Sequence, residues 1–108
     1  MPWLVKEDKV LATVEVADTF VDRLKGLLGR SDVEGAYLIR RASSVHTMGM
    51  RFPIDVAYCD EELKVLATVT MPPMRVGRPR RRARVVIEAR AGAFERWGLH
   101  PGDTLEVR

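Results

Sequence analysis

The chain has 108 residues, of which 46% are hydrophobic and 31% are charged, and its formal net charge is +3. These values are typical of one folded globular domain and argue against intrinsic disorder. The single cysteine, Cys59, excludes an intramolecular disulfide and a zinc site built from several cysteines. Because no long apolar run and no signal-peptide pattern is visible, the sequence predicts a cytoplasmic protein without membrane insertion.

The positive charge is concentrated in one segment. Six of the ten residues from Arg75 to Arg84 are arginine, and Gly77 and Pro79 interrupt them. Glycine and proline break regular secondary structure, so this segment is predicted to be a basic loop.

The N-terminal third predicts a strand that includes Val5, a turn, and a second strand over Val10–Val16. Thr19 is a favourable residue for capping a helix, and apolar residues then recur at helical spacing until Gly29. A helix is therefore expected at Thr19–Leu28.

The rest of the chain predicts short strands separated by turns. The expected strands are Ala36–Ile39, Phe52–Cys59, residues 63–69, Arg84–Arg90 and Thr104–Val107. A short helix is expected at Ala91–Trp97 and should end at Gly98. The pattern lacks a β-α-β rhythm. It therefore predicts one mainly β domain over residues 1–108, an antiparallel sandwich or barrel with an N-terminal helix and a short C-terminal helix.

Several motifs together point to a known family. They are Arg23-Leu24-Lys25-Gly26-Leu27-Leu28, His46-Thr47-x-x-Met50-x-Phe52-Pro53-Ile54-Asp55, Val86-Ile87-Glu88 followed by Ala91-Gly92, and Gly98-Leu99-x-Pro101-Gly102-Asp103. With them the chain resembles the bacterial and archaeal domain-of-unknown-function family 192 over nearly its whole length. Met48 stands where an aromatic residue is expected. The resemblance implies a compact β-rich fold with a short helix, and it implies no activity.

The polar run from His46 to Asp55 is the leading candidate site because it joins a strand, and binding residues are often placed beside a rigid element. A histidine oriented by a carboxylate can bind a ligand or act as a general base, so the two side chains are expected within mutual reach. The structural alternative is that His46 caps a turn before the strand and Asp55 hydrogen-bonds loop amides. The candidate ligand-binding residues are His46, Thr47, Met50, Arg51, Asp55 and Glu88. The leading interpretation is a non-catalytic small-ligand-binding or accessory domain, and the alternative is an enzyme of unassigned chemistry that uses His46 and Asp55.

Two further patterns have structural alternatives. Glu88 lies within a strong strand, where a buried carboxylate needs a partner such as Arg23 or Arg51. His46, Met48 and Met50 alternate imidazole and thioether groups, which suit Cu(I), but methionines also fill cores. The sequence therefore predicts no metal site and no cofactor.

The basic loop gives a third interpretation, a polyanion-binding or nucleic-acid-binding accessory protein. Its candidate phosphate contacts are Arg75, Arg78, Arg80, Arg81, Arg82 and Arg84. The structural alternative is a solvated loop. No aromatic residue lies in the loop to stack on bases, and no helix-turn-helix pattern accompanies it.

Overall fold

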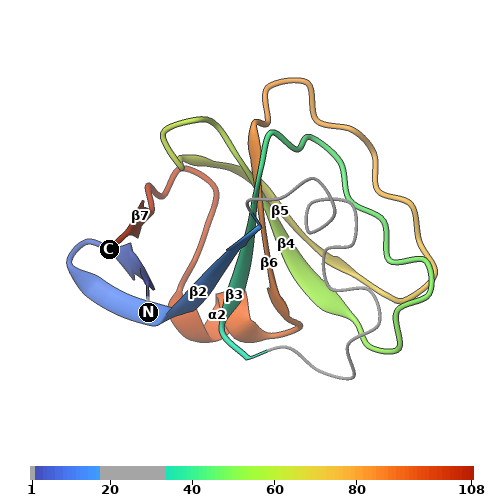
Figure 1. Cartoon of the computed structure of the whole chain (residues 1–108), viewed down its shortest axis with the longest axis horizontal. Helices are drawn as coiled ribbons and strands as arrows, with labels where there is room; N and C mark the ends of the chain where they lie inside the picture. Colours follow the sequence, from blue (N-terminus) through green and yellow to red (C-terminus); the bar gives the residue numbers. More distant parts are fainter. Residues whose placement is uncertain (1, 18–33) are drawn as a thin grey trace.

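The structure is a computed structural model that describes residues 2–17 and 34–108, so the predicted helix at Thr19–Leu28 lies outside the described residues. The described strands form one seven-stranded sheet in the order β5-β4-β6-β3-β2-β1-β7 (Figure 1). The strands are β1 (Trp3–Lys6), β2 (Lys9–Ala17), β3 (Ala36–Arg40), β4 (Ile54–Cys59), β5 (Val65–Met71), β6 (Val85–Arg90) and β7 (Glu106–Val107). The short helix α2 (Ala93–Trp97) follows β6, as the sequence predicts.

The sheet differs from the predicted antiparallel sandwich or barrel. It is a single sheet that does not close into a barrel, and β2 pairs with β3 in parallel, with Val14 opposite Ala36. The first half of β2 pairs instead with β1 in an antiparallel hairpin. The prediction was wrong on these points because alternation along a strand indicates its buried face but not the strand that it pairs with.

The two ends of the chain meet in this sheet. β7 pairs with β1, the Trp3 N–H donates to the Arg108 carbonyl at 2.7 Å, and the Arg108 N–H donates back at 2.9 Å. The turn before β7 also reaches the start of β5, where the Val65 N–H donates to the Asp103 carbonyl at 2.8 Å. Beyond Val65, β5 pairs only with β4 and is an edge strand among the described residues.

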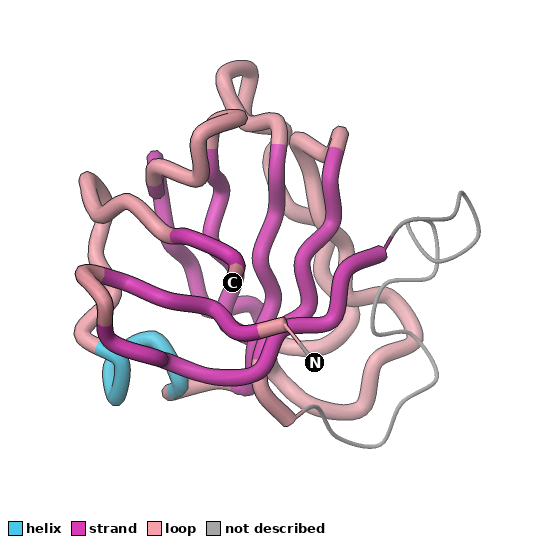
Figure 2. The backbone as a smooth tube through the Cα atoms, turned by 60° about the vertical axis from the view of Figure 1, so that its left-hand side comes forward, coloured by secondary structure: helices cyan, strands magenta, loops and turns pink. Residues whose placement is uncertain are grey.

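Both faces of the sheet are covered, so every residue of the inner strand β4 is buried. The face that we call the helix face carries Leu38, Ala57 and Ile87, which pack with Phe94 of α2. The opposite face, the loop face, carries Val56, Tyr58 and Val86, which pack with Val45, Met50 and Ala83 from long loops. Figure 2 shows these loops beside the strands. Burial on two faces explains why β4 and β6 carry apolar residues on both faces, with Asp55 and Glu88 as their buried polar residues.

Helix α2 is short because glycines in the left-handed conformation bound it. Gly92 has a φ of 92° and Gly98 a φ of 64°, and the Gly98 N–H donates to the Glu95 carbonyl at 3.1 Å. Glycine adopts positive φ without the steric cost that other residues incur, so it ends helices readily. Within the described part of the chain, no helix is long and apolar enough to cross a membrane.

Candidate functional site

Thr47, a predicted ligand-binding residue, instead joins the loop before β4 to the loop after β5. Its side chain is fully buried. Its Oγ1 donates to the Pro72 carbonyl at 2.6 Å and accepts from the Arg75 N–H at 2.9 Å. Its own N–H donates to the Arg75 carbonyl at 2.7 Å, and its carbonyl accepts from the Met74 N–H at 2.9 Å. All of its polar groups are therefore used within the protein.

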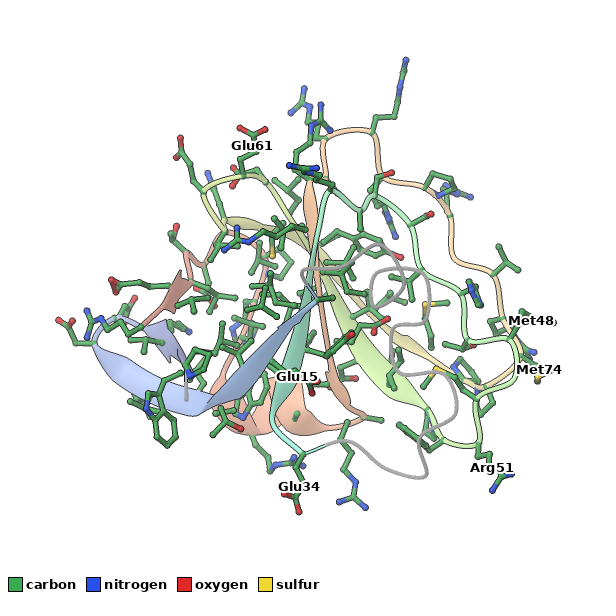
Figure 3. The ribbon with its side chains drawn as sticks, viewed as in Figure 1. Glu15, Glu34, Met48, Arg51, Glu61 and Met74 are labelled. Carbon is green, nitrogen blue, oxygen red and sulfur yellow. The ribbon has the colours of Figure 1, made fainter. Side chains whose placement is uncertain are left out.

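The rest of this run does not form a convergent site. His46 is exposed, pairs with Val76 through its backbone, and accepts a hydrogen bond at Nδ1 from the Met48 N–H at 3.3 Å. Met50 is buried in the loop-face core, whereas the Met48 side chain is 43% exposed. Figure 3 shows Arg51 projecting outward at this end of the molecule. One imidazole and two thioethers therefore do not share one accessible face.

Asp55 is buried and holds three elements together. Its Oδ1 accepts from the Thr70 hydroxyl of β5 at 2.7 Å. Its Oδ2 accepts from the Gly92 N–H at 2.9 Å and the Phe94 N–H at 3.1 Å, which satisfies donors at the start of α2. These contacts place the carboxylate on the helix face.

The predicted pairing of His46 with Asp55 is not formed, since no hydrogen bond joins these two described residues. The physical reason is the direction of each side chain. Val45 and Met50, which flank His46 in the chain, pack on the loop face, whereas strand alternation turns Asp55 toward the helix face.

Glu88 is buried on the loop face, opposite Tyr37 of β3 and Val56 of β4. Burial raises the pKa of this carboxyl from 4.5 to about 7. Among the described residues, its Oε1 has no hydrogen-bond partner. Of its two predicted partners, Arg51 is exposed and makes no ion pair with it, and Arg23 lies outside the described residues.

One arginine of the basic loop, Arg80, is half-buried. The Cζ of Arg80 lies 5.1 Å from the centre of the Tyr58 ring, and the Arg80 N–H donates to the Ser43 carbonyl at 2.8 Å. Burial raises the pKa of the Tyr58 hydroxyl, and the nearby Arg80 opposes this shift. Arg80 therefore packs the loop onto the sheet, while the other five loop arginines are exposed.

A pocket of about 540 Å³ lies where the basic loop meets the end of β3. We call it the arginine pocket; its charged and hydroxyl lining consists of Arg40, Arg41, Arg81, Arg84, Glu61 and Ser43. Four cations thus surround one carboxylate. Arg40 and Arg41, at the end of β3, were not predicted as site residues from the sequence. Two adjacent arginines directly after a predicted strand were a usable signal for them.

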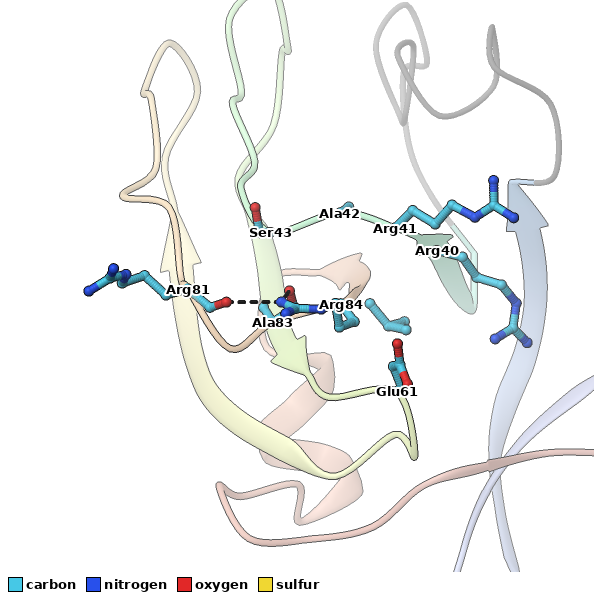
Figure 4. A pocket seen from close by; sticks show the side chains of 9 residues that line it. Arg40, Arg41, Ala42, Ser43, Glu61, Arg81, Ala83 and Arg84 are labelled. Atoms are coloured by element: carbon cyan, nitrogen blue, oxygen red, sulfur yellow. Dashed lines mark hydrogen bonds between the residues drawn. The ribbon is translucent and has the colours of Figure 1, made fainter.

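The guanidinium groups of the arginine pocket do not converge. Nη1 of Arg84 donates to the carbonyls of Arg81 and Ala83, each at 2.9 Å. Figure 4 shows the Arg81 side chain pointing away from Arg84, while Arg40 and Arg41 extend in the opposite direction. The arginines thus give this region a positive electrostatic potential, but their hydrogen-bond donors do not point toward one position where a ligand could bind.

An acidic turn faces the same loop. Asp60, Glu61 and Glu62, between β4 and β5, line a second pocket of about 410 Å³ together with Arg82 and Arg84. Opposite charges so close together weaken the field that a distant polyanion meets. The loop is therefore a less extended basic surface than its sequence suggests.

The fold and these sites define a small β domain with one sheet, a loop-covered face and a basic pocket. Its described residues contain no group of three or more His, Cys, Asp or Glu side chains that could hold a metal ion. The chain belongs to the domain-of-unknown-function family 192, described as an uncharacterized ACR family, whose model matches residues 3–107. The family resemblance seen in the sequence is confirmed.

Relatives and solved structures agree with this assignment. The chain is 31% identical to a UPF0127 protein of Pyrococcus horikoshii over 111 residues, which cover 95% of this chain and 96% of that protein. A UPF0127 protein of Thermococcus gammatolerans is 33% identical over 98 residues, but the match spans 85% of this chain and only 64% of that longer protein.

Two crystal structures share the fold. One is a protein of unknown function from Novosphingobium aromaticivorans, with a TM-score of 0.81 and 20% identity over 97% of this chain and 82% of that one. The other, from Sinorhizobium meliloti, is described provisionally as a transcription regulator, with a TM-score of 0.82 and 22% identity over 98% of this chain and 91% of that one. At such identities these structures show the fold alone.

Proposed function

We propose that the chain is a non-catalytic domain that binds a small anionic ligand, carrying phosphate or carboxylate groups, in the arginine pocket. One observation carries the proposal: a pocket of about 540 Å³ has four arginines and one glutamate around it. That volume lies within the range of small-molecule sites, roughly 300–1,000 Å³. Arginine is well suited to such ligands because its planar guanidinium binds carboxylate and phosphate through two parallel hydrogen bonds.

Ligand binding requires a rearrangement of Arg81. This side chain is exposed and its guanidinium makes no hydrogen bond within the described residues, so it is free to turn toward an anion. Ordering one such side chain costs about 0.5–1.5 kcal/mol. Arg84 needs less rearrangement because two carbonyls already hold its Nη1. The pocket is therefore expected to bind its ligand with modest affinity and to discriminate mainly by charge.

The enzyme alternative has less support. It depends on His46 and Asp55 acting together, whereas the three hydrogen bonds to Asp55 come from Thr70 and the start of α2. A general base must lie within hydrogen-bond reach of the group that it serves or orients. The geometry of Asp55 instead fits a structural residue.

Binding of a polyanion through the basic loop is a second candidate, favoured by the five exposed arginines. One solved structure with this fold is described provisionally as a transcription regulator, and proteins of that class commonly bind nucleic acid. The five-residue helix α2 is too short to read a DNA groove, so any such binding would use phosphate contacts with little sequence preference.

The experiment is calorimetric titration with pyrophosphate, ATP and citrate at constant ionic strength. Replacing Arg81→Gln should weaken binding about tenfold, the usual effect of losing a charged hydrogen bond. Arg78→Gln is the matched control, because it removes the same charge from the same loop outside the pocket and should change binding less than about twofold. Equal losses in both variants would indicate a diffuse charge effect. Absence of binding by all three anions at about 10 mM would contradict the proposal.

A further inference from the structure

The outer edge of β5 is open along most of its length. Among the described residues, only its first residue, Val65, makes backbone hydrogen bonds away from β4, to Asp103 and Gly102. Residues 66–70 make no backbone hydrogen bond in the described part of the protein other than those of the β4 pairing. Because the backbone groups of an antiparallel strand point alternately toward and away from its partner, about every second residue of this stretch presents a donor and an acceptor that an added strand can use.

Within the part of the chain that the structure describes, this edge also lacks the usual protection against strand addition. The sequence of β5, Val-Leu-Ala-Thr-Val-Thr-Met, contains no charged residue and no proline. The register shift in its pairing lies at its start, opposite Tyr58 and Cys59, and leaves the rest regular. Proteins usually protect an exposed edge with lysine, proline, a bulge or a covering segment. An unprotected edge of this length is typical of a site that pairs with another strand.

A pocket of about 340 Å³ lies beside this edge. Thr68 and Thr70 of β5 line it together with Phe94 and Glu95 of α2. Thr70 is opposite Asp55, whose carboxylate contacts α2, so the pocket opens on the helix face. A strand added along β5 would place every second side chain on this face, next to Thr68 and Thr70.

The pocket is acidic although the whole chain is basic. Its carboxylates are Asp55 and Glu95, its one other ionisable side chain is His100, and no lysine or arginine lines it. The oxygens of Asp55 already accept three hydrogen bonds, whereas the Glu95 side chain is exposed and makes none in the described residues. Buried Phe94 gives the pocket an apolar wall. A lysine or arginine side chain fits this lining, since its methylene groups cover apolar surface while its head meets a carboxylate.

We propose that the edge of β5 is a docking site for an extended basic segment of a partner protein, which adds to the sheet as a further strand and places a Lys or Arg side chain beside Glu95. The main-chain hydrogen bonds supply affinity and the acidic pocket supplies selectivity. This site shares no lining residue with the arginine pocket, so the two proposals are tested independently of each other.

The test uses two fluorescein-labelled peptides, Thr-Val-Thr-Lys-Thr-Val-Thr and the same peptide with a central glutamate, in anisotropy titrations at low salt. The lysine peptide should bind about tenfold tighter than the glutamate peptide. Hydrogen exchange should slow at the outward-facing amides of residues 66–70 when the lysine peptide is added and should stay unchanged in β2. A lysine peptide methylated on alternate backbone nitrogens, prepared in both registers, should lose binding in the register that faces β5.

Glu95→Lys should weaken binding of the lysine peptide about tenfold, because it replaces an attraction with a repulsion. Glu34→Lys is the matched control; it makes the same charge change at an exposed position outside the pocket and should leave binding unchanged. Equal binding of the two peptides, binding without protection of β5, or no binding at about 1 mM would overturn the proposal. A dimer whose β5 amides are protected without peptide would also overturn it, since a second copy would then occupy the edge.

Discussion

Replacing Thr47 with valine tests whether the central motif residue is structural. Valine has nearly the same shape as threonine but lacks the hydroxyl. The change therefore removes the bond of 2.6 Å to the Pro72 carbonyl and the bond of 2.9 Å from the Arg75 N–H, without changing the chain path. Thr47 is fully buried and both hydrogen bonds are partly buried, so water can replace the lost partner only in part.

The expected loss follows from these two bonds. A buried polar group left without a partner costs about 1–3 kcal/mol, so two such groups predict a loss of roughly 3 kcal/mol in the free energy of unfolding. Unfolding entropy of about 2.1 cal/mol/K per residue converts this loss, for a chain of 108 residues, to a fall in Tm of about 10–15 °C.

Urea unfolding followed by tryptophan fluorescence would measure this difference. Thr68→Val is the matched control, because it removes a hydroxyl from a half-buried threonine whose side chain makes no hydrogen bond in the described part of the chain. The control should change the free energy by less than about 0.5 kcal/mol. If Thr47→Val were as mild as the control, the view that Thr47 joins the two loops would be refuted.

Three other predictions follow from burial and charge. Because burial raises the pKa of Glu88 to about 7, the folded protein keeps a proton that the unfolded chain releases, so stability should fall by up to roughly 3 kcal/mol between about pH 4.5 and 7. Glu88→Gln should abolish that fall in pH-dependent unfolding; an unchanged profile would argue against it. Burial also raises the pKa of Cys59 to about 12, so a thiol reagent at pH 8 should react with it only after unfolding, and rapid labelling of the native protein would contradict this. If the basic loop binds DNA, its five exposed arginines predict a log–log salt slope of about −4.5, and replacing Arg81 and Arg82 with glutamine should reduce it by roughly 2, whereas a slope near zero would exclude phosphate contacts.

Local features of the fold were predictable from the sequence, whereas pairings between distant segments were not. The alternation in Phe52–Cys59 and the glycine after Trp97 predicted β4 and α2 within a few residues. The parallel pairing of β2 with β3 has no local signature, because both strands have the same alternation in either direction. For the same reason the sequence indicated a chemically interesting Asp55 but not the contact that uses it, which comes from α2, 37 residues further along the chain.

Residue type alone could not decide the roles of the candidate site residues. Threonine and aspartate serve equally well as ligands and as partners for loop amides, and only the fold shows that Thr47 and Asp55 are used internally. The arginine pocket needed the opposite information, namely that the end of β3 lies next to the basic loop. A run of like-charged residues in the sequence predicts the sign of a surface charge, but it does not predict which other segments lie next to that surface.

The pairing of β1 with β7 has a consequence for the order of folding. It joins Leu4 to Val107, so about 100 residues must be synthesised before β1 has both of its neighbours. During synthesis on the ribosome, the outer edge of β1 in the β1–β2 hairpin therefore remains unpaired until β7 has been made. Contacts this distant in the sequence also slow folding, since the entropy of closing the loop is lost before the contact forms. A newly made chain is thus exposed to wrong strand partners longest at its first strand, and a holding chaperone would be most useful there.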